Sequence, residues 1–102
     1  MMEQALQQAI NTIVKTADPD KIILFGSRAR GDNRLDSDYD LLVLKKGIEK
    51  PREVGRKLYR SLVPVGLAVD LIVETPERFN ELKENKFLIY REIAKGKVIY
   101  EK

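Results

Sequence analysis

Apolar residues recur every three or four positions in some segments of the chain and form short continuous runs in others. The first pattern predicts amphipathic helices, and one of them opens the chain and ends before Asp18-Pro19. Another begins at Pro51, with Val54, Leu58 and Leu62 on its inner face. The same spacing predicts two further helices, one capped by Thr75-Pro76 with Phe79 and Leu82 facing inward, and one over 87–93 that is ended by Gly96.

Three short segments rich in apolar residues, at 22–25, 38–44 and 65–73, predict strands, and residues 97–101 are expected to add an edge strand. The third run is rich in Val and is bounded by proline-containing turns, which indicates a strand inside a sheet. Helices and strands therefore alternate along the chain. This alternation predicts an α/β (α+β) fold in which a small mixed sheet is flanked by helices, as one domain over residues 1–102.

The strand predicted at 22–25 leads directly into Gly26 and Ser27. Gly26 allows a tight exit from the strand, and Ser27 with the Arg28-Ala29-Arg30 segment can open a short helix. A strand-to-helix turn of this kind directs backbone N–H groups at an anion, so phosphate is one candidate ligand. An ordinary turn with a helix cap also explains the Gly-Ser dipeptide when it is taken alone.

Two aspartates, Asp38 and Asp40, begin the strand predicted at 38–44. The two-residue period of a strand puts both carboxylates on one face and apolar side chains on the other. Two like charges about 4 Å apart repel by roughly 4 kcal/mol at an effective dielectric constant of 20, so the pair favours a bound divalent cation. Oxygen ligands indicate Mg²⁺ or Mn²⁺. A solvated acidic stretch that includes Asp36 is the alternative interpretation.

A third carboxylate, Asp70, is the only charge in the apolar run at 65–73. A carboxylate buried there without a partner would cost several kcal/mol, so we expect it to meet a positive charge. The partner could be the metal ion of the Asp38 and Asp40 pair. A salt bridge to a buried arginine is the alternative.

Together these residues resemble the motif of the polymerase-beta-like nucleotidyltransferase superfamily. The resemblance is carried by Gly26-Ser27, a ten-residue spacer, Asp38-x-Asp40 and the later Asp70, and it covers the region 21–73. It implies a polymerase-beta-like nucleotidyltransferase fold and a metal-dependent transfer of a nucleoside monophosphate, from a nucleoside triphosphate to an acceptor hydroxyl, with release of pyrophosphate. It also implies two Mg²⁺ ions, with Mn²⁺ as a substitute.

The same resemblance assigns roles to individual residues. Asp38 and Asp40 would bind both metal ions, and Asp70 would bind the ion that activates the acceptor hydroxyl. Gly26 and Ser27 would hold the β- and γ-phosphates of the nucleotide. The residues that could add phosphate contacts are Arg28 and Arg30, and the sequence does not decide between them.

The small size of the chain resembles the minimal nucleotidyltransferase (MNT) branch of the superfamily. That branch implies an antitoxin that transfers AMP from ATP to a tyrosine of a cognate HEPN-domain toxin, a helical ribonuclease. A chain of 102 residues has no second domain to hold an acceptor, so a protein that brings its own surface, or a second copy of this chain, fits best. A hetero-complex or a homo-oligomer is therefore expected.

Two other functions stay open at this point. The chain could neutralise a partner by contact alone, with a vestigial aspartate site. It could also transfer nucleotides to a nucleic acid or a small molecule, for which the hint is a basic cluster of Lys45, Lys46, Lys50, Arg52, Arg56, Lys57 and Arg60. A solvated helix face, partly balanced by Glu49 and Glu53, explains the same cluster.

Composition excludes several classes of site. The chain has no cysteine and no histidine, which removes disulfides, thiolate metal sites and the commonest general base, so catalysis would depend on carboxylates and metal. A net charge of +3 is too small to indicate nucleic-acid binding by itself. No apolar stretch approaches the length of a membrane span, and the start lacks the pattern of a signal peptide, so we expect a cytoplasmic protein without membrane contact.

Overall fold

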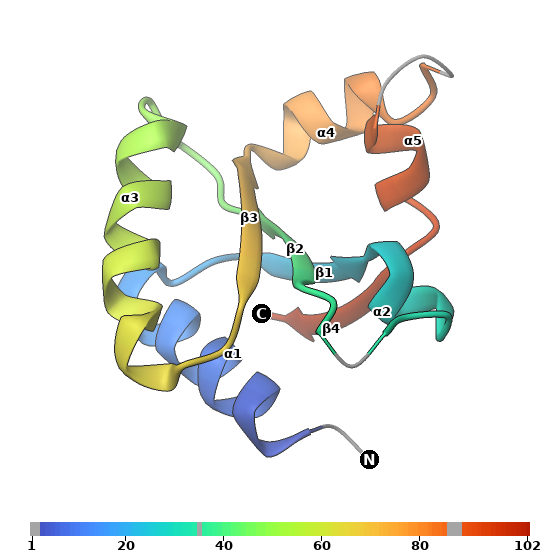
Figure 1. Ribbon diagram of the computed structural model, residues 1–102. Helices are drawn as coiled ribbons and strands as arrows, with labels where there is room; N and C mark the ends of the chain where they lie inside the picture. The colour runs from blue at the N-terminus through green and yellow to red at the C-terminus, as the bar shows by residue number, and fades with distance from the viewer. Residues whose placement is uncertain (1–2, 35, 86–88) are drawn as a thin grey trace.

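A computed structural model describes residues 3–34, 36–85 and 89–102, and its centre is a four-stranded mixed sheet (Figure 1). The strands lie in the order β3-β2-β1-β4. The helices are α1 (Gln4–Ala17), α2 (Gly26–Arg30), α3 (Pro51–Leu62), α4 (Pro76–Leu82) and α5 (Ile89–Ile93), with a 3-10 turn, η1 (Val63–Val65). The strands are β1 (Lys21–Phe25), β2 (Tyr39–Leu44), β3 (Val69–Glu74) and β4 (Lys97–Glu101).

The register of the strands brings the three predicted motif segments to one end of the sheet. β1 pairs antiparallel with β2, and Phe25 lies opposite Asp40. β2 pairs parallel with β3, through a crossover that contains α3, and Asp40 lies opposite Asp70. The last residue of β1, from which Gly26 leaves, therefore lies beside the start of β2, and the start of β3 lies on the other side of β2.

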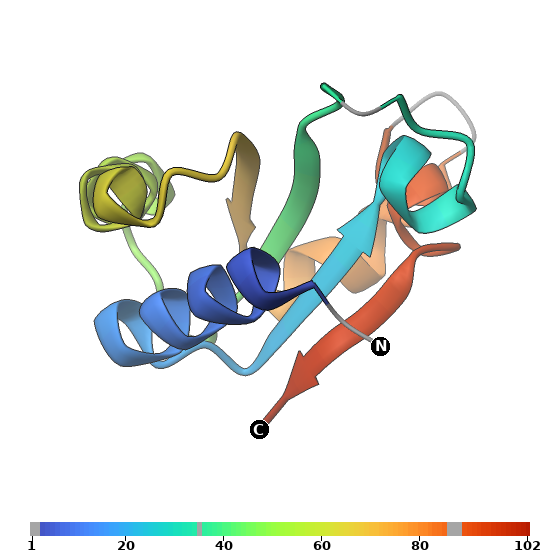
Figure 2. The same cartoon turned by 60° about the horizontal axis from the view of Figure 1, so that its bottom comes forward.

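Helices cover both faces of the sheet (Figures 1 and 2). On one face α1 and α3 bury a core with alternate residues of β1 and β2, whose members include Ile10, Ile13, Ile22, Leu41 and Leu58. On the other face α4 and α5 contribute Phe79 and Ile93 to a second core. The predicted inner face of α3 is confirmed, since Leu58 and Leu62 are buried and Val54 packs against the first core.

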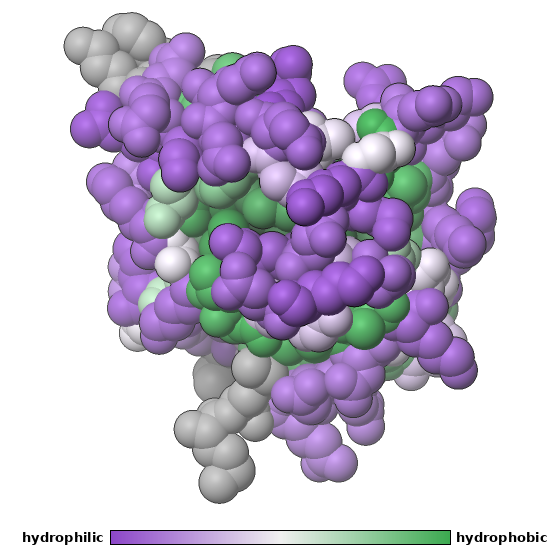
Figure 3. Space-filling view, turned by 180° about the vertical axis from the view of Figure 1, so that it is seen from behind, coloured by the Kyte–Doolittle hydropathy of each residue, from purple (hydrophilic) through white to green (hydrophobic). Residues whose placement is uncertain are grey.

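Charged and polar side chains cover most of the face seen from behind in Figure 3, where apolar surface is gathered in a central band. This distribution agrees with a chain in which 34% of the residues are charged. Within residues 3–34, 36–85 and 89–102, no helix has both the length and the apolar character that a membrane crossing requires.

The prediction for the third strand was wrong in two respects. The strand begins at Val69 rather than at residue 65, because residues 63–65 form a 3-10 turn that ends at Gly66, where φ is +73°. β3 is also an edge strand, not an internal one. Its apolar residues nevertheless pack on both faces of the sheet, with Leu71 against the first core and Ile72 against the second, so its composition resembles that of an internal strand. Asp70 is consequently exposed, and the expected penalty for a buried charge does not apply.

The remaining elements follow the predictions closely. The first helix, the edge strand at 97–101 and the short helix after Gly26 are confirmed. Asp38 lies just before β2, which begins at Tyr39. For the last predicted helix, residues 87 and 88 lie outside the described residues, and α5 accounts for the rest of it.

Candidate functional site

Gly26 lies directly against the carboxylate of Asp40. A Cβ atom added at residue 26 would lie 2.2 Å from Oδ2 of Asp40 and 3.2 Å from its Cγ. Gly26 also has φ +74°, a left-handed conformation that other residues adopt at a cost. Two independent requirements therefore call for glycine here, one of backbone conformation and one of space. The sequence predicted only the first.

Asp40 is half-buried and sits among charges of both signs. Its pKa lies above the ordinary value of 3.8, chiefly because burial disfavours the charged form. The negative charges of Asp70 and Asp38 raise this pKa further, and the positive charge of Arg30 opposes them. Asp38 and Asp70 therefore lie close enough to Asp40 for their charges to affect its ionisation.

The three aspartates differ in how tightly the fold positions them. Asp40 and Asp70 are paired in the parallel register of β2 and β3, where neighbouring strands lie about 4.8 Å apart, and equivalent side chains point to the same face. Asp38 is exposed and precedes the strand. Asp70 is exposed as well, and no salt bridge to an arginine, the alternative partner, is found for it among the described residues.

The donor chemistry of this cluster fits a hard divalent cation, because all three side chains offer carboxylate oxygens and together carry three negative charges. Within the described part of the chain, no group of three or more acidic side chains is already close enough to hold a metal ion. A common ion would therefore require the exposed side chains of Asp38 and Asp70 to rotate toward Asp40.

Ser27 does not act as a helix cap. The helix α2 begins at Gly26, and its capping position is Phe25, whose side chain accepts no hydrogen bond. The carbonyl of Ser27 accepts hydrogen bonds from the N–H groups of Gly31 and Asp32, at 2.9 and 3.2 Å, and these bonds close the helix. The cap interpretation of the Gly-Ser dipeptide therefore does not describe this turn.

The two arginines of α2 lie in different environments. The guanidinium of Arg28 donates to the carbonyl of Ser37 from Nε at 3.1 Å and from Nη2 at 2.9 Å, and lies 4.3 Å from the ring centre of Tyr39. This arginine ties the connection before β2 to the helix. Arg30 is exposed, forms an ion pair of 3.1 Å with Asp32, and lines a cavity with Gly26 and Asp40. Of the two, Arg30 lies at the aspartate site.

A cavity of about 550 Å³ opens beside Gly26 and Asp40, a size typical of small-molecule sites. Its apolar walls include Phe25 and Ala29, the turn after α5 adds Lys95, and the start of β4 adds Lys97. Sequence reasoning missed these two lysines. The sequence feature that could have pointed to them is the glycine between them, Gly96. In the structure this glycine packs tightly against β1, since a Cβ added there would lie 2.4 Å from the carbonyl oxygen of Leu24.

Comparison with known proteins gives a consistent picture. The family model described as "Polymerase beta, Nucleotidyltransferase" matches residues 7–102. The chain is 32% identical over 102 residues to a protein of Methanocaldococcus jannaschii named "Putative protein adenylyltransferase MJ0604". That alignment covers 96% of this chain and 97% of the relative, so the two proteins are similar along nearly their whole lengths.

Solved structures share the fold at lower identity. A crystal structure described as a nucleotidyltransferase candidate from Sulfolobus solfataricus superposes with a TM-score of 0.62 at 20% identity, covering 100% of this chain and 91% of that one. A toxin-antitoxin crystal structure with AMP-PNP superposes with a TM-score of 0.59 at 22% identity, covering 94% of this chain and 73% of that one. At these identities the similarity is one of fold.

Proposed function

Because the chain belongs to the polymerase beta nucleotidyltransferase family, we propose that it transfers AMP from ATP to a hydroxyl group of a protein. The observation that carries this proposal is the contact between Gly26 and Asp40, with Asp70 in register beside Asp40. It joins the turn proposed to hold phosphate to the carboxylates proposed to hold metal. The name of the Methanocaldococcus relative supports a protein as the acceptor.

Two Mg²⁺ ions, or Mn²⁺ in their place, would be held by Asp38, Asp40 and Asp70. When bound, such ions neutralise charge on the reacting phosphate and stabilise the attacking and leaving oxygens. Gly26 and Ser27 would position the β- and γ-phosphates, and Arg30 adds a positive charge on the same side of the sheet.

The reaction exchanges a phosphoanhydride linkage of ATP for a phosphoester linkage to the acceptor. The acceptor oxygen forms a bond to the α-phosphorus of ATP, the bond from that phosphorus to the bridging oxygen breaks, and pyrophosphate leaves. Asp70 is exposed at the start of the edge strand and is the residue we propose to accept the hydroxyl proton. Positioning and charge neutralisation supply most of the rate enhancement in such a reaction.

For the acceptor we propose a tyrosine of a HEPN-domain toxin, which would make this chain the antitoxin of the pair. The toxin-antitoxin structure with AMP-PNP supports this assignment through its shared fold. The competing function is neutralisation by contact alone. The two differ in one respect: contact alone predicts that an Asp38→Asn variant still protects cells from the partner, whereas transfer predicts that it does not.

The experiment that tests the proposed function uses ATP labelled at the α- or the γ-phosphate. The purified wild type and an Asp38→Asn/Asp40→Asn variant are incubated with Mg²⁺ in a lysate of the source cells. Label from α-ATP, but not γ-ATP, on a discrete protein with the wild type only would support transfer of AMP and identify the acceptor. Label on RNA would indicate a nucleic-acid acceptor. No label, with a control transferase active in the same lysate, would favour contact alone.

A further inference from the structure

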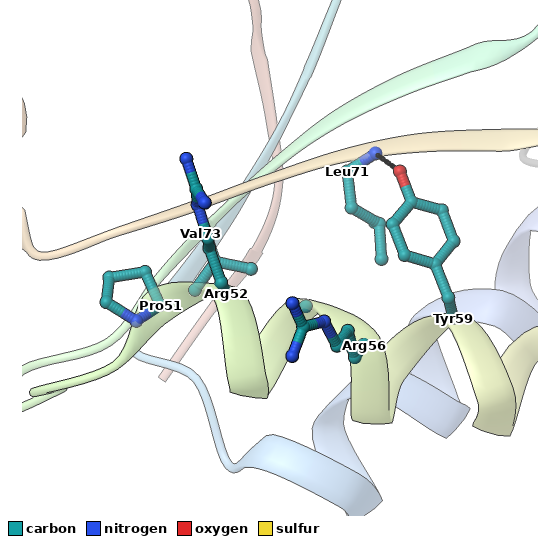
Figure 4. Close-up of a pocket in the computed structure, with 7 residues that line it drawn as sticks. Pro51, Arg52, Arg56, Tyr59, Leu71 and Val73 are labelled. Carbon is teal, nitrogen blue, oxygen red and sulfur yellow. Dashed lines mark hydrogen bonds between the residues drawn. The ribbon is translucent and has the colours of Figure 1, made fainter.

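A second cavity, of about 300 Å³, lies between α3 and the edge strand β3, and Asp40 is not part of its lining (Figure 4). Leu71 and Val73 of the strand form its apolar floor, and Arg52, Arg56 and Tyr59 of the helix form its wall. Gly55 also lines the groove, and a Cβ added there would lie in ordinary van der Waals contact with the Val73 side chain, at 3.8 Å.

The wall of the groove carries two positive charges without partners inside the described chain. Arg52 and Arg56 are one helical turn apart, both are exposed, and neither has a hydrogen bond or ion pair with another described residue. The carboxylate of Glu53 on the same helix is already paired with Lys50, at 3.8 Å. Two adjacent guanidinium groups above an apolar floor suit carboxylate ligands, because each guanidinium can bind a carboxylate through two parallel hydrogen bonds.

The outer edge of β3 is reached from the same groove. The backbone N–H of Leu71 donates a 2.7 Å hydrogen bond to the hydroxyl of Tyr59 (Figure 4). A carbonyl of an extended peptide could take the place of that hydroxyl, as happens when a chain adds to a sheet edge. Residue 71 follows Asp70 directly, and successive residues of a strand are about 3.3 Å apart and point to opposite faces. A strand added to this edge would therefore place one of its residues beside Asp70, with the side chain on the face to which Asp70 points.

We propose that this groove docks an acidic, extended segment of the protein that receives the nucleotide, and so brings its hydroxyl side chain to Asp70. The inference rests on the proposed function. The two arginines of the wall favour an acidic segment. The apolar floor and the main-chain N–H of Leu71 favour a peptide over the phosphate backbone of a nucleic acid. The acceptor site is then expected to have Asp or Glu within a few residues of the modified hydroxyl.

The test measures binding in the absence of metal and nucleotide, so that it is independent of catalysis. The probes are a fluorescein-labelled peptide with one tyrosine and alternate glutamates, the same peptide with glutamines, and a single-stranded oligoribonucleotide. The proteins are the wild type, Arg52→Gln/Arg56→Gln, and a control, Lys15→Gln/Lys57→Gln, that removes the same charge from exposed positions outside the groove. Thermal melting of each protein verifies the fold.

We expect the glutamate peptide to bind the wild type and the lysine control alike, and to lose about tenfold or more in affinity with the arginine variant, since charge-assisted pairs are lost. The glutamine peptide should bind weakly to all three. The proposal is overturned by equal binding of both peptides, by no binding to the wild type, by equal losses in both variants, or by a preference for the oligoribonucleotide. Specific peptide binding without any ATP transfer would instead count against the proposed function alone.

Discussion

The substitution Gly26→Ala tests the contact between the turn and the aspartate site. It adds one methyl group that would lie 2.2 Å from Oδ2 of Asp40, nearer than atoms in proteins approach a Cβ. Either the carboxylate or the turn must therefore move. The carboxylate is the freer of the two, because it ends a side chain whereas the turn is anchored at both ends by β1 and α2.

The expected loss of stability comes mainly from the backbone. A non-glycine residue in the left-handed region costs roughly 1–2 kcal/mol, and residue 26 has φ +74°. For a domain of this size each kcal/mol lowers the melting temperature by about 4–8 °C. The displaced carboxylate has a larger effect on activity, since a shift of about 1 Å in a catalytic group can cost on the order of a hundredfold in rate.

A matched control separates these two effects. Gly47 has φ +76°, and no other described part of the chain lies within 4 Å of a Cβ added there. Gly47→Ala therefore introduces similar backbone strain without moving a carboxylate. We expect both variants to lose similar stability in urea denaturation, and only Gly26→Ala to lose Mg²⁺-dependent transfer of AMP from α-labelled ATP.

Two results would refute this reasoning. Gly26→Ala with the kcat/KM of the wild type would mean that the position of the Asp40 carboxylate does not matter for transfer. Equal loss of activity in both variants, measured well below their melting temperatures, would assign the effect to stability instead of site geometry.

Three further predictions concern stability. The pKa of Asp40 in the folded protein is raised above 3.8, so the fold loses stability as the pH rises from 3.8 through this raised pKa and the carboxyl ionises. Asp40→Asn should therefore increase the free energy of unfolding at neutral pH without metal, and this gain should vanish below pH 3.8. A decrease at neutral pH would contradict the prediction. Burial, together with the 2.7 Å hydrogen bond that the hydroxyl of Tyr90 donates to Glu74, raises the pKa of Tyr90 to about 12, so the free energy of unfolding should fall as the pH rises from 10 to about 12. Tyr90→Phe should remove that fall, measured by denaturation at each pH, and should cost about 1 kcal/mol of stability at neutral pH. Tyr59→Phe should lower the free energy of unfolding by about 0.5–1.5 kcal/mol in urea denaturation, because the Leu71 N–H loses its acceptor, and an unchanged value would show that water replaces the hydroxyl fully.

The parts of the fold that the sequence predicts well are those in which one local rule dominates. The spacing of apolar residues located α1 and α3, and the Gly-Ser turn was found because a strand-like run stops at a residue that tolerates unusual dihedral angles. The two-residue period of a strand places Asp40 but does not extend to Asp38, because β2 begins at Tyr39.

Two features were not predicted from the sequence. Residues 65–68 have the composition of a strand, but Pro64 lacks an N–H and Gly66 adopts φ +73°, so a turn forms instead. Arg28 and Arg30 are equivalent on a helix of five residues, and the contacts of Arg28 with Ser37 and Tyr39 are what separate their roles. The difference between the two arginines depends on contacts with the segment before and at the start of β2, which no local pattern encodes.

If carboxylates of β2 and β3 hold divalent metal beside the Gly26 turn, Mn²⁺ should bind there, and its binding can be measured without any acceptor. Electron paramagnetic resonance counts the bound ions with a non-hydrolysable ATP analogue present, for the wild type, Asp40→Asn and Glu77→Gln, which removes an exposed carboxylate on α4 instead. We expect tight binding in the wild type and in Glu77→Gln, and its loss in Asp40→Asn. Equal binding in all three proteins would contradict it.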